Sequence, residues 1–148
     1  MTITVYGSPV AQGNHRTSQT GVIYETTKGH RPWRDSVGWA AREAGGRVAG
    51  PVQVSMSFTL PKPASAPKRR VTYPDRKPDL SKLVRAVEDA LTDAGVWEDD
   101  ARVIKCVSRK VFPGESPFAL DRPGCVIEIE EVNCERHNNH VSVPALRV

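Results

Sequence analysis

A proline-rich, strongly basic segment in the middle of the sequence places the firmest limit on how this chain can fold. Residues 61–78 are PKPASAPKRRVTYPDRKP and hold five of the twelve prolines. Proline lacks a backbone N–H group and fixes φ, so repeated prolines exclude both a helix and a central strand. The segment is therefore expected to be an extended loop, with the regular elements before and after it.

The charge of this segment is as unusual as its proline content. Against the single anion Asp75 it carries six cations, namely Lys62, Lys68, Arg69, Arg70, Arg76 and Lys77. Its charge of +5 exceeds the +4 of the whole chain. A solvated linker is one interpretation, and an arm that neutralises phosphates along a nucleic-acid backbone is the other. The charge alone leaves both open.

The periodicity of apolar residues predicts the elements around the loop. Alternation predicts strands, and recurrence every three to four residues predicts helices. The expected strands cover residues 1–6, 22–24, 52–60, 102–112 and 125–132, and the expected helices cover Arg31–Arg47 and Asp79–Ala94. We therefore expect a small α/β (α+β) domain, in which a mixed sheet carries two main helices packed on one face.

Local signals define the ends and faces of these elements. Asp79 occupies the N-cap position of the second helix and Gly95 follows its last turn, while Gly45–Gly46 ends the first helix. Polar and apolar residues alternate over 52–60, which predicts a strand buried on one face only. Gly7–Arg16 is turn-like, so no strand is predicted there.

Length and composition indicate one globular domain without a membrane segment. The 148 residues are 39% hydrophobic and 26% charged. No apolar run approaches the roughly 20 residues that span a bilayer. Three cysteines without paired spacing predict no disulfide framework, so we expect a cytoplasmic protein. The expected domain covers residues 1–132, and 133–148 form a polar tail.

Acidic residues gather on and after the second helix, at Asp79, Glu88, Asp89, Asp93, Glu98, Asp99 and Asp100. Next to a basic loop, such carboxylates suit a divalent metal that activates water for attack on a polyanion. The other interpretation is structural: Asp79 caps the helix, Asp89 pairs with Arg85, and the last three residues form a solvated turn. The residues by themselves do not decide between the two.

The stretch Arg76–Val103, RKPDLSKLVRAVEDALTDAGVWEDDARV, resembles the signature region of the RusA family. These are the crossover (Holliday) junction endodeoxyribonucleases of bacteria and their phages. The matching positions are Asp79, Leu83, Asp89-Ala90-Leu91-Thr92, Gly95, Trp97, Asp99-Asp100 and Val103, and the separation of 21 residues between Asp79 and Asp100 is kept.

The resemblance implies a homodimeric endonuclease, dependent on Mg²⁺ (or Mn²⁺), that binds branched DNA and nicks two strands of a four-way junction symmetrically. It implies that Asp79 and Asp100, helped by Asp99, ligate the metal. Arg85 would act with the two aspartates by stabilising phosphate charge. DNA would be held by basic residues of the loop and the helix, namely Lys68, Arg69, Arg70, Arg76, Lys77 and Lys82.

Ser81 departs from the family pattern, which has a second acidic residue two positions after Asp79. A serine hydroxyl brings no negative charge to a divalent ion. Arg85 replaces the family lysine; it keeps the positive charge but cannot act as a proton carrier. The leading hypothesis is therefore a junction-resolving endonuclease, and the alternative is a junction-binding protein that lost activity through Ser81. A basic scaffold with no DNA role is a third hypothesis, and it predicts no salt-dependent binding.

Two groups of polar residues are weaker candidates for function. Cys134, His137 and His140 are spaced like zinc ligands but lie in the polar tail. His15 and Arg16 follow a turn and are candidates for contact with DNA.

The tryptophans and one cysteine are expected to be structural. Trp33, Trp39 and Trp97 are predicted as core residues or dimer anchors. Cys106 alternates with its neighbours on a predicted strand and is expected to be an inert, half-buried thiol.

Overall fold

The structure is a computed structural model that describes residues 1–13, 15–25 and 29–133. Side chains at 15–17 and 23–25 are not part of this description. The candidate zinc ligands Cys134, His137 and His140 therefore lie outside the described residues. For the candidate DNA contacts His15 and Arg16 the structure describes the backbone but not the side chains.

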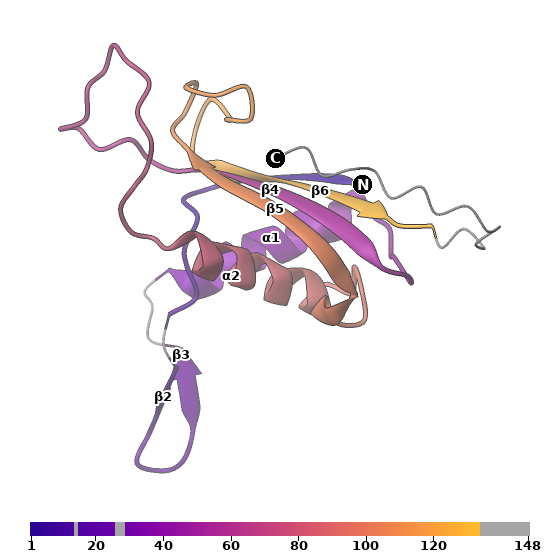
Figure 1. The fold of residues 1–148 in the computed structure, drawn as a ribbon. Coiled ribbons are helices and arrows are strands. Elements are labelled where there is room, and N and C mark those ends of the chain that lie inside the picture. The colour runs from indigo at the N-terminus through magenta and orange to yellow at the C-terminus, as the bar shows by residue number, and fades with distance from the viewer. Residues whose placement is uncertain (14, 26–28, 134–148) are drawn as a thin grey trace, which may run out of the picture.

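Four strands form one mixed sheet. In spatial order they are β1 (Thr2–Tyr6), β6 (Gly124–Glu131), β4 (Val52–Thr59) and β5 (Val103–Val111). β6 pairs antiparallel with both of its neighbours, whereas β4 and β5 are parallel. β1 and β5 are the edges. A separate ribbon of two short strands, β2 (His15–Thr17) and β3 (Ile23–Glu25), projects from the domain (Figure 1).

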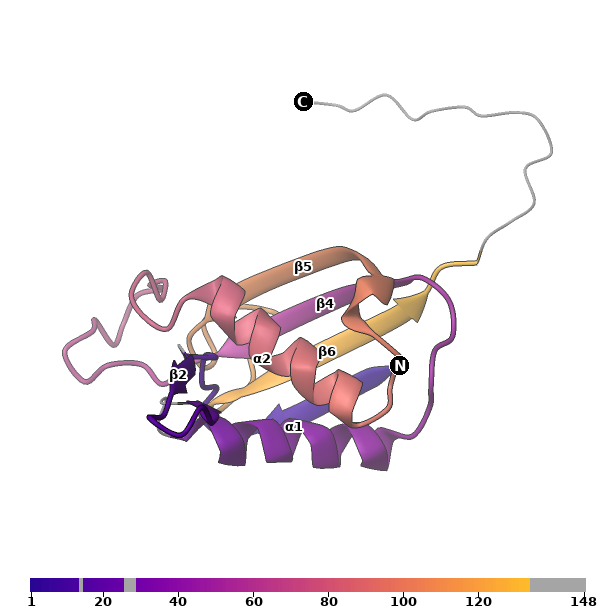
Figure 2. The same ribbon diagram turned by 90° about the horizontal axis from the view of Figure 1, so that it is seen from below.

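Both helices lie on the same face of the sheet. α1 (His30–Ala44) runs beneath β1, and α2 (Leu80–Asp93) lies beside it under the other strands (Figure 2). The short 3₁₀ helix η1 (Asp100–Arg102) leads into β5. The predicted fold class is confirmed. Among the described residues, no helix is long and apolar enough to cross a membrane.

Apolar side chains between the helices and the sheet form the core. Ile127 and Phe58 project from the sheet and are fully buried, as are Leu83 and Leu91 from α2. Trp97, in the turn after α2, is 1% exposed, and its indole Nε1 donates a hydrogen bond of 2.7 Å to Thr92 Oγ1. A buried indole N–H commonly has such a partner. The turn that reverses the chain is therefore fixed to the helix that precedes it.

β4 is more deeply buried than its alternating sequence predicts. Ser57 and Thr59 lie on the face opposite the helices, yet they are 5% and 0% exposed. Arg109 donates to Ser57 Oγ at 2.8 Å, and the backbone N–H of Leu120 donates to Thr59 Oγ1 at 2.9 Å. The expectation of one buried face is thus wrong for this half of the strand, because β5 and the β5–β6 connection cover it.

The other predicted elements begin and end within three residues of their expected limits, but β2 is an element that the sequence does not predict. Its three residues, His15–Thr17, lie in a segment without apolar alternation. They are ordered as a strand by pairing with β3. The predicted helix end at Gly45–Gly46 is confirmed, since α1 ends at Ala44 and Gly45 has a φ of 62°.

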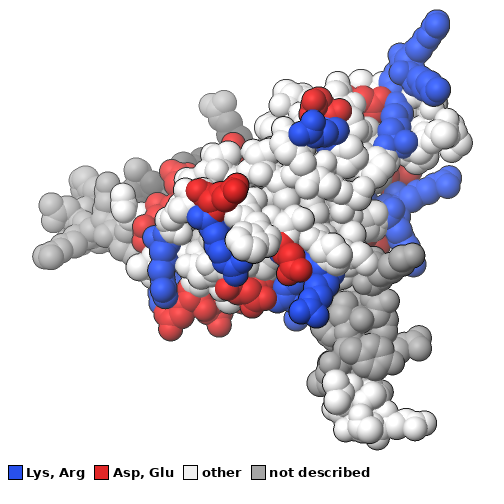
Figure 3. Space-filling view, turned by 180° about the vertical axis from the view of Figure 1, so that it is seen from behind, with Lys and Arg blue, Asp and Glu red and all other residues white. Residues whose placement is uncertain are grey.

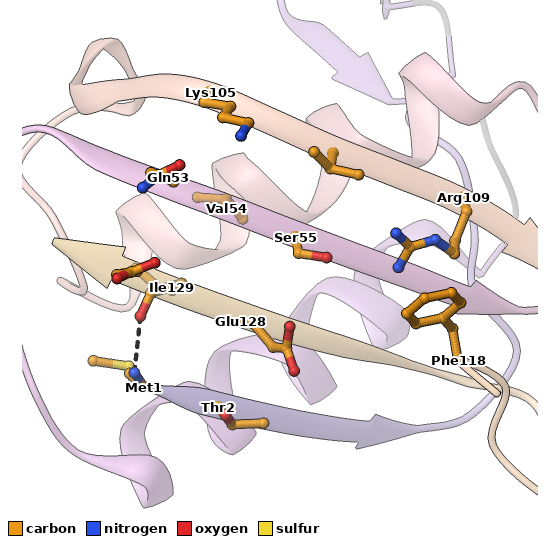
Figure 4. Close-up of a pocket in the computed structure, with 12 residues that line it drawn as sticks. Met1, Thr2, Gln53, Val54, Ser55, Lys105, Arg109, Phe118, Glu128 and Ile129 are labelled. Atoms are coloured by element: carbon orange, nitrogen blue, oxygen red, sulfur yellow. Dashed lines mark hydrogen bonds between the residues drawn. The ribbon is translucent and has the colours of Figure 1, made fainter. Parts of the chain in front are cut away.

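The rest of the open sheet face is solvent-accessible and carries many polar side chains, beside the exposed apolar Val107 of β5 and Phe118 of the β5–β6 connection. A shallow hollow there is bordered by Lys105 and Arg109 on β5, by Gln53 and Ser55 on β4, and by Glu128 on β6 (Figure 4). An antiparallel or mixed sheet with helices on one face commonly presents such a polar second face to water.

The basic loop, residues 61–78, contains no helix or strand, as its prolines predict. It is nevertheless fixed at both ends. Near its start Lys62 forms an ion pair with Glu115 of the β5–β6 connection. At its end Lys110 Nζ donates to the carbonyl oxygens of Arg76 and Pro78 at 2.9 and 3.0 Å. The loop is therefore a tethered arm.

We expect Gly124→Ala to destabilise the protein. A Cβ atom at this position would lie 2.3 Å from the Val5 carbonyl oxygen and 2.8 Å from Leu120 Cδ1. The strands would have to shift, so the free energy of unfolding should fall by roughly 1–3 kcal/mol in a denaturant titration.

The matched control is Gly38→Ala inside α1, where the nearest atom to the added Cβ, Arg42 Nη1, is 3.9 Å away. Alanine is the better helix former, so this variant should be more stable than the parent by up to about 1 kcal/mol. Equal effects of the two substitutions would contradict the close approach of β1 and β6.

Candidate functional site

The basic loop and the start of α2 meet at the end of the sheet where the parallel strands β4 and β5 terminate (Figure 1). Five cations of this loop are exposed, namely Lys68, Arg69, Arg70, Arg76 and Lys77. Lys and Arg side chains project from this end of the molecule in Figure 3. The predicted DNA-holding residues are thus free to meet a large polyanion.

Asp79 occupies the N-cap position of α2 but makes no side-chain capping hydrogen bond. Its carboxylate is exposed, with Oδ2 3.8 Å from Lys82 Nζ one turn further along the helix. Asp79 therefore occupies the predicted capping position, but the predicted capping hydrogen bond of its side chain is not formed. The charge of this carboxylate remains accessible for other chemistry.

Asp99 and Asp100 lie at the other end of the crossover, where the chain turns back into β5. Asp99 is the N-cap of η1, and its Oδ1 accepts a 2.7 Å hydrogen bond from the Ala101 backbone N–H. Asp100 is exposed in the first turn of η1. Of the two, Asp99 thus has a structural role, whereas Asp100 has a solvent-facing carboxylate.

Glu88 is the acidic residue with the most unusual environment. Burial, and then the negative charges of Asp100 and Asp89, raise the pKa of the Glu88 carboxyl above its ordinary value, while Arg85 opposes this effect. Partial desolvation by neighbouring residues, and then the charge of Glu88, raise the pKa of the Cys106 thiol. Glu88 therefore interacts electrostatically with Asp100 before β5 and with Cys106 on β5.

Glu88 belongs to the acidic group noticed in the sequence but is not among the predicted site residues. A signal for it exists, because Ser81 and Glu88 are seven residues apart and share one face of α2. Arg85 lies between them on the same face. Along this face, α2 therefore presents the hydroxyl of Ser81, the guanidinium of Arg85 and the half-buried carboxylate of Glu88.

One chain does not assemble the predicted metal ligands. Asp100 acts on Glu88, which is nine residues beyond Asp79 along α2. At about 1.5 Å per residue this is a separation of roughly 13 Å along the helix. Within 1–13, 15–25 and 29–133, no three His, Cys, Asp or Glu residues are placed to hold one ion. The described residues of a single chain therefore do not by themselves fit a divalent metal.

The remaining residues of the site are accessible on α2. Ser81, Lys82 and Arg85 are exposed. The expected pair between Asp89 and Arg85 is not among the ion pairs of the described part of the chain. Arg85 instead acts on Glu88, one turn away.

Trp33 and Trp97 are core residues, as expected. Trp39 is 66% exposed on α1, with the Arg42 guanidinium 5.6 Å from its ring, so it is not a core residue, and its role as a dimer anchor stays a prediction. One structural expectation needs correction. Cys106 is exposed, in contrast to the half-buried thiol that its strand position predicts. The reason is that β5 is an edge strand and α2 covers it only in part.

Comparison with known proteins identifies the class. Residues 6–130 match the family model of endodeoxyribonuclease RusA, so the chain belongs to the RusA family. This is a family of DNA endonucleases that act on Holliday junctions, and the resemblance seen in the sequence is confirmed. The chain is also 29% identical over 143 residues to the uncharacterized protein YqaN of Bacillus subtilis (strain 168), covering 88% of this chain and 95% of YqaN.

The environment of Glu88 predicts a pH-dependent gain in stability for Glu88→Gln. A raised pKa means that the folded chain binds this proton more tightly than the unfolded chain does. Ionised Glu88 therefore costs stability, and the cost develops as the pH rises above the ordinary value of 4.5. We expect Glu88→Gln to have a higher Tm than the parent near neutral pH and a similar Tm below that value.

The control is Glu43→Gln, which changes an exposed glutamate on α1. It should leave Tm unaltered at both pH values. A lower Tm of Glu88→Gln at neutral pH would show that the Glu88 charge is favourably paired.

Proposed function

We propose that this chain is a structure-selective endonuclease that resolves Holliday junctions by nicking two strands symmetrically. Membership of the RusA family carries this proposal, because the matched residues 6–130 include the acidic and basic positions discussed above. The tethered basic loop supports it as well. An arm fixed to the fold at Lys62 and near Pro78 presents its cations at one end of the sheet, where they neutralise phosphates.

In this proposal the acidic positions Asp79 and Asp100 act together, with dependence on Mg²⁺ or Mn²⁺. Their separation along α2 means that one chain supplies only part of the required set. The proposal therefore includes a homodimer in which Asp79 of one copy is completed by Asp100 of the other. Arg85 lies between these positions on α2 and would stabilise the charge of the phosphate under attack.

The free edge of β5 is a suitable surface for this dimer. It is nine residues long, and beside its cations Lys105, Arg109 and Lys110 it exposes the apolar Ile104 and Val107. The unpaired N–H and C=O groups of so long an edge favour pairing with another strand. Two copies of β5 related by a two-fold axis run antiparallel, so the start of one strand lies opposite the end of the other. Lys110, near the end of β5, is bonded to Pro78 beside Asp79. Such pairing brings Asp100 of one copy toward Asp79 of the second.

The charges on α2 and the turn after it favour the same arrangement. Lys82 and Arg85 lie in the first half of α2, whereas Asp89 lies in the second half and Asp99 and Asp100 lie in the turn after it. Asp93, at the end of α2, is already paired with Arg34 of α1. Antiparallel apposition of two α2 helices places the basic half of each beside the acidic half of the other. Opposite charges across a two-fold axis favour association and fix its register.

A cleavage assay on a synthetic four-way junction tests the proposed activity against its alternative. Ser81 is exposed and lacks the charge of the family residue, and this observation favours a junction-binding protein without catalysis as the second candidate. We expect the parent to nick the junction symmetrically with Mg²⁺ or Mn²⁺, and Ser81→Asp to nick it faster. Ser81→Ala is the matched control and should resemble the parent.

Parent protein that retards the junction in a gel without cutting it would favour the alternative, provided that Ser81→Asp cuts. Absence of cutting by both variants, together with absence of binding, would contradict both functions.

Mixing two inactive variants tests whether the site is shared between copies. The substitutions are made in the parent or in Ser81→Asp, whichever of the two cleaves the junction. Asp79→Asn and Asp100→Asn should each be inactive, because each removes a charge from both sites of a homodimer. In a mixed dimer, one site receives both substitutions and the other receives none. We therefore expect nicking to return on mixing, at up to about half the parent activity per mixed dimer.

The control mixes Asp79→Asn with a second inactive preparation of the same variant, and no activity should return. If Asp79→Asn and Asp100→Asn fail to complement although both are folded dimers, the acidic residues act within one chain.

A further inference from the structure

The basic loop exposes two apolar side chains between its two groups of cations. Tyr73 is 75% exposed and Val71 is 56% exposed. Three cations, Lys68–Arg70, precede this pair, and Arg76 and Lys77 follow it. Apolar groups so placed reach any polyanion that the cations bind.

In residues 71–73 the apolar side chains are exposed and the polar hydroxyl group is buried, which is the reverse of the usual arrangement. Residues 71–73 form no helix or strand and their side chains alternate in direction, with Val71 and Tyr73 facing solvent. The Thr72 hydroxyl between them is buried and has no hydrogen-bond partner within the part of the chain that the structure describes. The chain thus buries an unsatisfied polar group and exposes an aromatic one, and each choice costs free energy in the isolated protein.

The ring of Tyr73 also differs from the other exposed aromatic rings of the described chain. Arg122 lies 3.9 Å from the ring centre of Tyr6, Arg109 lies 3.8 Å from that of Phe118, and Arg42 lies 5.6 Å from that of Trp39. No such cation covers Tyr73 among the described residues. Its faces are therefore available to a planar group from outside the protein.

Tyr73 is held in place by the local backbone. Its carbonyl oxygen accepts a 2.9 Å hydrogen bond from the Asp75 N–H. Three residues beyond Tyr73, the Arg76 carbonyl oxygen is bonded to Lys110 on β5. Part of the entropic cost of ordering the backbone that carries this ring is thus already met in the free protein.

We propose that Tyr73, with Val71 beside it, stacks on an unpaired or unstacked base at the branch point of the DNA while the flanking cations hold the phosphates. Every base has an aromatic face, and its edges and faces become accessible where a duplex is interrupted. A continuous duplex keeps its bases stacked and offers only phosphates to the loop. The inference rests on the proposed function and assigns branch selectivity to this part of the loop.

The test uses the full-length protein and four-way junctions that carry 2-aminopurine either at the branch point or in the middle of an arm. We expect the parent to change the fluorescence of the branch-point probe only. Tyr73→Ala should abolish this change and weaken junction binding roughly 10-fold, whereas Tyr73→Phe should keep both. Because the Tyr73 side chain neutralises no phosphate, the slope of log K against log salt should stay that of the parent.

Two comparisons separate stacking from electrostatics. Phe118→Ala removes an exposed aromatic ring that Arg109 already covers, and it should leave the branch-point signal intact. Replacing Lys68, Arg69, Arg70, Arg76 and Lys77 by Ala should weaken binding to junction and duplex alike. It should also flatten the salt slope by up to about 0.9 for each phosphate that the loop no longer neutralises.

Parent and Tyr73→Ala proteins with equal junction affinity and equal fluorescence changes would overturn the inference while leaving junction binding intact. A parent that binds neither junction nor duplex near 50 mM salt would overturn the proposed function and the inference with it. Tyr73-dependent binding to phosphatidylserine vesicles in place of junctions would overturn the inference in favour of a membrane surface.

Discussion

The parallel pairing of β4 with β5 is the constraint on which the rest of the molecule depends. Parallel neighbours cannot be joined by a hairpin, so the chain leaves β4 at Thr59 and returns to the opposite end of the sheet at Val103. The basic loop, α2 and η1 are that return. The pairing thus places the loop at one end of the crossover and the acidic turn at the other, with the length of α2 between them.

The framework could be predicted from the sequence because its signals are local. The prolines of 61–78 exclude regular structure without help from distant residues, and α2 follows from its own apolar stripe between Asp79 and Gly95. The burial of Ser57 and Thr59 could not be predicted in this way. Arg109 and Leu120, which bond to them, lie 52 and 61 residues further along the chain.

The candidate site could be predicted in its residue types but not in its geometry. The family motif identifies Asp79 and Asp100, but a separation of 21 residues in sequence does not determine a distance when a helix lies between them. For Glu88 the position could be predicted but the environment could not. Its place on the face of α2 is visible in the sequence, whereas its charged surroundings exist only because η1 returns alongside the helix.

Because the basic loop is tethered at both ends, its length can change without a change in the rest of the domain. The ion pair at Lys62 and the hydrogen bonds of Lys110 fix where the loop begins and ends. The entropy of closing a flexible loop grows only with the logarithm of its length, so doubling that length costs about 0.6 kcal/mol. Insertions and deletions between the two tethers therefore alter the reach of the arm at little thermodynamic cost. Selection can adjust that reach to differently shaped DNA without rebuilding the core.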